Sequence, residues 1–101
     1  MAVGAAQMVF SKIEHKGRVL RATPPLELNP TLDEESQQVY VVTDDSLDIH
    51  VFAYTREELA GELAEYIFCA WDNYAKEDPE KLGPKARELR AALRDRFQEG
   101  A

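Results

Sequence analysis

Four side chains in one short stretch carry atoms that could bind a cation: Asp44, Ser46, Asp48 and His50. The first three imitate the alternating oxygen ligands of a calcium loop. Such a loop also needs a glycine for its sharp turn and a bidentate glutamate at its end, but Ile49 and Thr55 stand at those positions. Because Asp and Ser readily hydrogen-bond their own backbone at turns, we interpret this stretch as a hairpin turn. We predict no metal and no other cofactor.

Nucleophilic catalysis would require the only thiol, Cys69, to lie beside His15 or His50, the two histidines of the chain. Their spacing does not support such a pair. Glu65 and Asp72 lie near Cys69 on a predicted helix, and this acidic environment disfavours the reactive thiolate. The glutamates of that helix are typical of a solvated face near a positive helix N-terminus. We therefore predict no catalytic residue and a protein that is not an enzyme.

Charge is distributed unevenly along the chain, whose net charge is -7. Residues 1–83 contain 7 basic and 16 acidic side chains, whereas residues 84–101 contain 5 basic and 3 acidic ones. The acidic part of the chain, residues 1–83, should repel nucleic acid and favour a basic protein partner. The side chains that we expect to contact this partner share one face of a predicted helix: Glu58, Glu62, Glu65 and Asp72.

The basic end of the chain supports a different function, a regulator that binds nucleic acid. Its candidate phosphate contacts lie on the last predicted helix: Arg87, Arg90 and Arg94. The sequence contains neither a helix-turn-helix pattern nor strands that combine aromatic and basic residues. We therefore do not expect nucleic acid as the main partner, and instead expect these arginines to balance the charge of the neighbouring acidic helix.

Two pairs of apolar runs predict two β-hairpins. The first pair covers residues 9–14 and 18–22 around Lys16-Gly17, where the glycine suits a positive φ. The second covers residues 39–42 and 47–53, and alternation in its last strand predicts one buried and one exposed face. Between the hairpins, Pro24 and Pro25 should end a strand, and residues 29–35 form either one helical turn or an acidic loop.

Two helices are predicted to follow the hairpins. Thr55 and Glu58 have the spacing of a capping box and start a helix that runs from Arg56 to about Lys76. Its apolar arc is broad, which indicates contact with both the sheet and the last helix. The last helix runs from Pro84 to about Gln98, with an apolar stripe of Ala86, Leu89, Leu93 and Phe97.

These elements predict one α+β domain over residues 1–101: a four-stranded antiparallel sheet from two hairpins, followed by two helices packed on it. We expect residues 1–6 to be disordered, residues 7–54 to form the sheet region and residues 55–98 the helical region. The single cysteine, and the absence of a signal peptide or an apolar run long enough to span a membrane, predict a cytoplasmic protein.

Residues 40–59, which include Tyr40-Val41-Val42 and the stretch from Asp48 to Leu59, resemble the HicB-like antitoxin superfamily in their hairpin, Thr-x-Glu-Glu-type helix start and amphipathic helix. The resemblance implies a curled antiparallel sheet with a helix on one face that binds and blocks a small basic ribonuclease toxin. We expect a small acidic protein-interaction module that is antitoxin-like. A nucleic-acid-binding regulator is the alternative.

Overall fold

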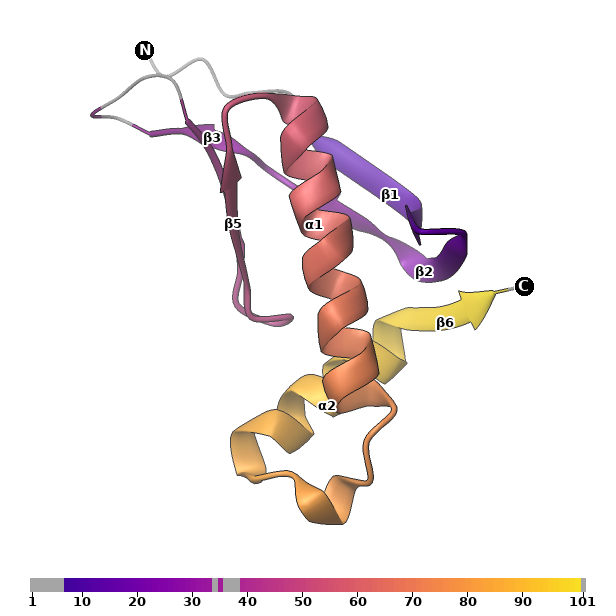
Figure 1. The fold of residues 1–101 in the computed structure, drawn as a ribbon. Helices are drawn as coiled ribbons and strands as arrows, with labels where there is room; N and C mark the ends of the chain where they lie inside the picture. Colours follow the sequence, from indigo (N-terminus) through magenta and orange to yellow (C-terminus); the bar gives the residue numbers. More distant parts are fainter. Residues whose placement is uncertain (1–6, 34, 36–38, 101) are drawn as a thin grey trace.

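Two separate three-stranded antiparallel sheets pack against one long helix in the computed structural model, which describes residues 7–33, 35 and 39–100 (Figure 1). The predicted single four-stranded sheet is therefore wrong, although the α+β class is confirmed. The predicted disorder of residues 1–6 lies outside the described residues. Each predicted hairpin forms, but each gains a third strand of its own.

The first sheet has the order β1-β2-β6 and contains the first hairpin. Strand β1 spans Met8–His15 and β2 spans Arg18–Leu28. The residues of the turn between them, Lys16 and Gly17, have φ values of 50° and 79°. Two consecutive positive φ angles characterise the tight turn whose twist matches that of the flanking strands. The first predicted hairpin is thus confirmed.

The prediction that Pro24 and Pro25 end the second strand is wrong, because β2 continues through them to Leu28. The pairing of β1 with β2 shifts its register at this point: Phe10 pairs with Leu26, and Lys12 pairs with Arg21. The two prolines fall among the β2 residues that the shift leaves without a partner on β1. Because proline cannot donate to a strand ladder, an irregularity of this kind lets the strand accommodate it.

The second sheet has the order β3-β4-β5 and contains the second hairpin. Strands β4 and β5 span Tyr40–Asp44 and Ile49–Ala53. Burial alternates along β5 as predicted, with Ile49, Val51 and Ala53 buried. Of the segment 29–35, Thr31–Leu32 form the short strand β3, which pairs with β4. This part of the segment is neither a helical turn nor a loop.

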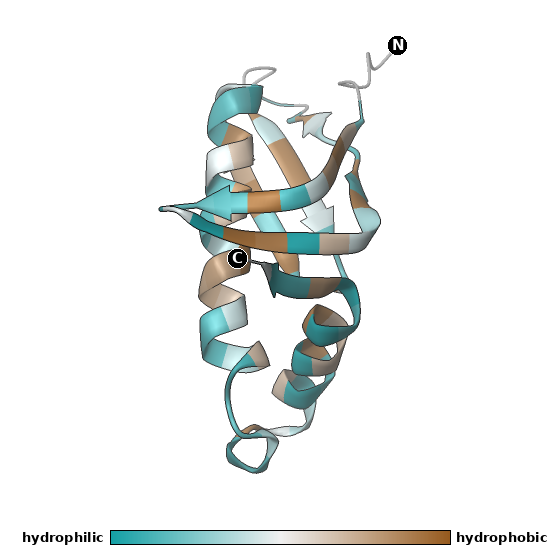
Figure 2. Cartoon of the chain, turned by 90° about the vertical axis from the view of Figure 1, so that its right-hand side faces the viewer, coloured by the Kyte–Doolittle hydropathy of each residue, from teal (hydrophilic) through white to brown (hydrophobic). Residues whose placement is uncertain are grey.

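Helix α1 spans Arg56–Ala70 and continues into a π-helical segment, η1, over Trp71–Ala75. Its most deeply buried side chains are Leu59, Leu63 and Ile67. Helix α1 contacts β4 and β5 of one sheet and β1 of the other, and η1 packs on the last helix. These contacts confirm the prediction that the long helix, through its broad apolar arc, touches strands on one side and the last helix on another. In Figure 2 many of the hydrophobic residues lie on the strands, whereas the outer side of α1 carries mostly hydrophilic ones.

After a short 3-10 helix, η2, at Pro79–Lys81, helix α2 spans Pro84–Arg96 and packs mainly on η1. The predicted end at about Gln98 is wrong, because Phe97–Gly100 form strand β6. The predicted helical region 55–98 therefore stops at Arg96. Phe97 is buried opposite Ala22 of β2, so it joins the core from a strand and not from a helix.

The strands that complete the two sheets also explain why the hairpins do not join. Strand β6 pairs with the side of β2 that faces away from β1, and β3 pairs with the side of β4 that faces away from β5. A four-stranded sheet would need one of those sides for the other hairpin, or else a direct pairing of β1 with β5. Instead, α1 contacts both β1 and β5.

Candidate interaction surface

Helix α1 begins at the residue that the sequence predicts. The Thr55 hydroxyl accepts a hydrogen bond from the Glu58 backbone N–H at 3.0 Å. Within the described residues, the Glu58 carboxylate does not return a bond to the Thr55 N–H, so only half of the capping box forms. Glu57 and Glu58 lie in the first helical turn, where carboxylates interact favourably with the positive end of the helix dipole.

The exposed side of α1 carries a row of glutamates. Glu58, Glu62 and Glu65 are all exposed, and their spacing of four and three residues places them on one stripe of the helix. They extend over roughly 10 Å along the helix axis at 1.5 Å per residue. Among the residues that the structure describes, none of the three forms an ion pair. These three residues, which we call the acidic face, are therefore available to positive groups from outside the chain.

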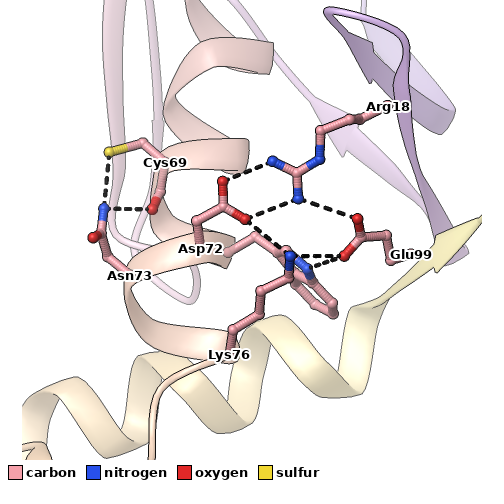
Figure 3. Close-up of polar contacts among 7 residues, drawn as sticks. Arg18, Cys69, Asp72, Asn73, Lys76 and Glu99 are labelled. Carbon is pink, nitrogen blue, oxygen red and sulfur yellow. Dashed lines mark hydrogen bonds and ion pairs between the residues drawn. The ribbon is translucent and has the colours of Figure 1, made fainter.

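The fourth predicted contact, Asp72, has partners within the chain (Figure 3). The Arg18 guanidinium donates two hydrogen bonds to its carboxylate, at 2.7 and 2.8 Å, and Lys76 Nζ lies 3.4 Å from Asp72 Oδ1. The hydrogen bonds from Arg18 contribute most to holding the pKa of Asp72 down to about 2. A partner that bound Asp72 would have to compete with this arrangement, so Asp72 is a weaker candidate than the acidic face.

Asp72 belongs to a four-residue charge cluster that ties together β2, the end of the long helix and β6. Glu99 accepts hydrogen bonds from Trp71 Nε1 at 3.0 Å and from Arg18 at 3.1 Å, and Lys76 Nζ lies 3.3 Å from its carboxylate. These contacts, with that of Trp71 the strongest, lower the pKa of Glu99. The cluster of Arg18, Asp72, Lys76 and Glu99 thus has two positive and two negative charges.

Aromatic contacts support the same cluster on the side of Arg18. The guanidinium carbon of Arg18 lies 4.9 Å from the centre of the Phe68 ring, within the range of a cation–π interaction. The His15 ring is 5.9 Å from Phe68, centre to centre. The bonds to Asp72 and Glu99 raise the pKa of Arg18 further above its ordinary value. Arg18 therefore stays positively charged at any ordinary pH and holds β2 to the end of the long helix and to β6.

Three of the four arginines of α2 have a role that the sequence did not indicate. Each donates a hydrogen bond to a backbone carbonyl before the helix: Arg87 to Pro79 at 2.7 Å, Arg90 to Glu77 at 3.0 Å, and Arg94 to Ala75 at 3.1 Å. Within the described part of the chain, they form no ion pair with the acids of α1. Contrary to our expectation, these arginines therefore do not balance the charge of the acidic helix. They hold the connection between the two helices in place instead.

The remaining candidates for chemistry have structural contacts. Asp44 accepts hydrogen bonds from the Ser46 hydroxyl at 2.6 Å and from the Leu47 backbone at 3.2 Å, as the turn interpretation predicts. Cys69 is exposed, and its sulfur lies 3.3 Å from the Asn73 amide nitrogen. Histidine, cysteine and acidic side chains of residues 7–33, 35 and 39–100 do not assemble into a group of three or more that could hold a metal ion.

Comparisons of the chain with family models, with curated proteins and with solved structures found no match. In the described residues, no helix is both long enough and apolar enough to cross a membrane.

Proposed function

We propose that the protein is a small, non-enzymatic interaction module that binds a basic protein partner through the acidic face of α1. The observation that carries this proposal is the row of Glu58, Glu62 and Glu65, exposed and without ion pairs among the described residues. Charges that already have internal partners contribute little to a new interface, whereas unpaired ones can steer and orient a partner of opposite charge.

If the protein is antitoxin-like, the class of its basic partner is also defined. A helix with an acidic outer face, packed on antiparallel strands, supports the HicB-like resemblance in general architecture. The partner is then a small basic ribonuclease toxin that the protein blocks in the cytoplasm. An adjacent reading frame that encodes a small, strongly basic protein would support this form of the proposal.

The contacts of α2 weigh against the alternative, a regulator that binds nucleic acid. Arg87, Arg90 and Arg94 each already use a guanidinium N–H to hold a backbone carbonyl. A phosphate would have to bind their remaining donors while these bonds persist, on a chain with a net charge of -7.

A capture experiment distinguishes the two functions. The tagged full chain is incubated with a lysate of its own cells, in parallel with two variants that change net charge equally. E62K/E65K reverses two acids of the acidic face, and E80K/E88K reverses two exposed acids elsewhere. We expect the wild type and E80K/E88K to retain the same basic protein and E62K/E65K to lose it. Recovery of nucleic acid alone, or equal retention by all three, would contradict the proposal.

A further inference from the structure

Strand β1 has an open edge. It lies at one end of the β1-β2-β6 sheet and pairs with β2 on one side only (Figure 1). No strand within the described residues pairs with its other side. An edge of this kind presents backbone N–H and C=O groups that can pair with another strand.

The hairpin turn determines which residues point toward that edge. With a two-residue turn at Lys16-Gly17, the flanking residues His15 and Arg18 form a hydrogen-bonded pair. Hydrogen-bonded and non-hydrogen-bonded pairs then alternate along an antiparallel ladder. Lys12 and Glu14 consequently direct their backbone N–H and C=O groups away from β2, toward the open edge.

Under two-fold symmetry, Lys12 and Glu14 of one copy are complementary in charge to Glu14 and Lys12 of a second copy. Lys12 and Glu14 lie on the same face of β1, are more than half exposed and form an ion pair at 2.9 Å. If a second β1 runs antiparallel with the two Ile13 residues opposite each other, Lys12 faces Glu14 of the second copy, and Glu14 faces its Lys12. A shift of two residues brings like charges opposite each other, and so does parallel pairing. Charge therefore selects one register.

The space beside the open edge of β1 is suited to a second β1 strand. A shallow groove of about 230 Å³ lies between β1 and α1, with this lining: Phe10, Lys12, Ile13, Glu14, Ala60 and Ala64. The helix contributes only the small residues Ala60 and Ala64 to this lining. Val9, earlier on β1, is 53% exposed. A strand added at this edge would thus meet small side chains on the helix and additional apolar surface along β1.

We propose that two copies of this chain associate through antiparallel pairing of β1 with β1, which joins two three-stranded sheets into one of six strands. The interface is isologous, as expected for a symmetric dimer, and each copy contributes both a Lys12 and a Glu14 to it. This self-association uses β1 and is independent of the acidic face of α1.

Sedimentation velocity of the full chain at several concentrations tests the proposal. The single reversals K12E and E14K place like charges opposite each other at both positions, and we expect each to weaken dimerisation by about tenfold. The double variant K12E/E14K restores complementarity and should dimerise like the wild type. K85E, which reverses an exposed lysine on α2, is the control for net charge and should leave dimerisation nearly unchanged.

Mixing the two single variants gives the most specific result. A K12E chain presents two glutamates and an E14K chain presents two lysines, so an equimolar mixture should form a heterodimer more readily than either variant forms a homodimer. If a single reversal fails to fold by circular dichroism, Lys12→Gln replaces it, with an expected weakening of about threefold. A wild type that stays monomeric up to about 1 mM, or a dimer that these substitutions leave unchanged, would overturn the proposal.

Discussion

At the scale of single residues, local hydrogen bonds are the most predictable part of this protein. Thr55 caps α1 because a Thr with a Glu three residues later suits a helix start, and Asp44 bonds its own turn. By contrast, Arg18 and Glu99 are 81 residues apart, and neither has a neighbour in the sequence that indicates the other. Side-chain contacts over that separation depend on the complete fold.

The cap of α1 gives a direct test at this scale. Thr55→Ala removes the acceptor of the Glu58 N–H, and we expect it to lower the free energy of unfolding by about 0.5 to 2 kcal/mol. Thr55→Ser keeps the hydroxyl and should retain most of the stability. Urea unfolding followed by circular dichroism measures both. Equal midpoints for Thr55→Ala and the wild type would show that the cap contributes nothing.

The charge cluster predicts how stability depends on pH. The folded-state pKa of Asp72, about 2, lies below its ordinary value of 3.8, and the pKa of Glu99 is also lowered. A depressed carboxylate pKa contributes stability above the ordinary pKa, and this contribution disappears as the pH falls toward the folded-state value. The wild type should therefore lose stability steadily between about pH 5 and pH 2.

Arg18→Gln provides the comparison, because it removes the main partner of Asp72. We expect this variant to be less stable than the wild type at neutral pH and to lose less stability on acidification. Trp71, the only tryptophan, bonds Glu99 within the cluster, so its fluorescence reports unfolding at each pH. Parallel pH profiles for the two proteins would argue against a stabilising role for the cluster.

At the scale of elements, the sequence predicts the hairpins and the long helix but not the third strand of either sheet. Strand β3 has only two residues, too few to show any alternation. Phe97 follows Leu89 and Leu93 at spacings of four, so it fits the helical period although it lies in β6. The apolar periodicity therefore predicts an end of α2 that lies too far along the chain. Tertiary pairing with β2, which a local pattern cannot indicate, determines where that helix ends.

The helical phase of α1 is tested by two adjacent residues. Leu63 is 2% exposed, and Leu63→Ala should cost about 2 to 5 kcal/mol because truncation leaves a cavity. Glu62→Ala, on the exposed face, should change stability by less than about 0.5 kcal/mol. Thermal and urea unfolding of both variants provide the comparison. Similar losses for the two would mean that the buried face of α1 is assigned incorrectly.

A second test at the scale of elements concerns the contact between α1 and the second hairpin. The Tyr66 hydroxyl lies 3.1 Å from the Leu47 carbonyl and 2.6 Å from the Asp48 carbonyl, and burial raises the pKa of Tyr66. Tyr66→Phe keeps the ring but removes the donor, so we expect a loss of about 0.5 to 1.5 kcal/mol in urea unfolding. An unchanged midpoint would indicate that the turn does not need this bond.

At the scale of the whole molecule, the distribution of charge separates two kinds of surface. The cluster around Arg18 is balanced internally, and Arg87, Arg90 and Arg94 hold backbone carbonyls. Within the described chain, the acidic face of α1 has no such ion-pair partners. The sequence predicts that Glu58, Glu62 and Glu65 share an exposed side of the helix, and their exposure agrees with this. It does not indicate the internal role of Asp72, because the pairing with Arg18 depends on where β2 meets the helix.

The association rate of the protein with its captured basic partner tests whether binding uses the acidic face of α1. We predict that the rate for the wild type falls as the ionic strength rises beyond about 0.15 M, where the screening length is about 8 Å. E62K/E65K should associate more slowly than the wild type at low salt, whereas E80K/E88K, with the same net charge, should stay close to it. An association rate that is insensitive to salt, or the same for both double variants, would contradict binding through the acidic face.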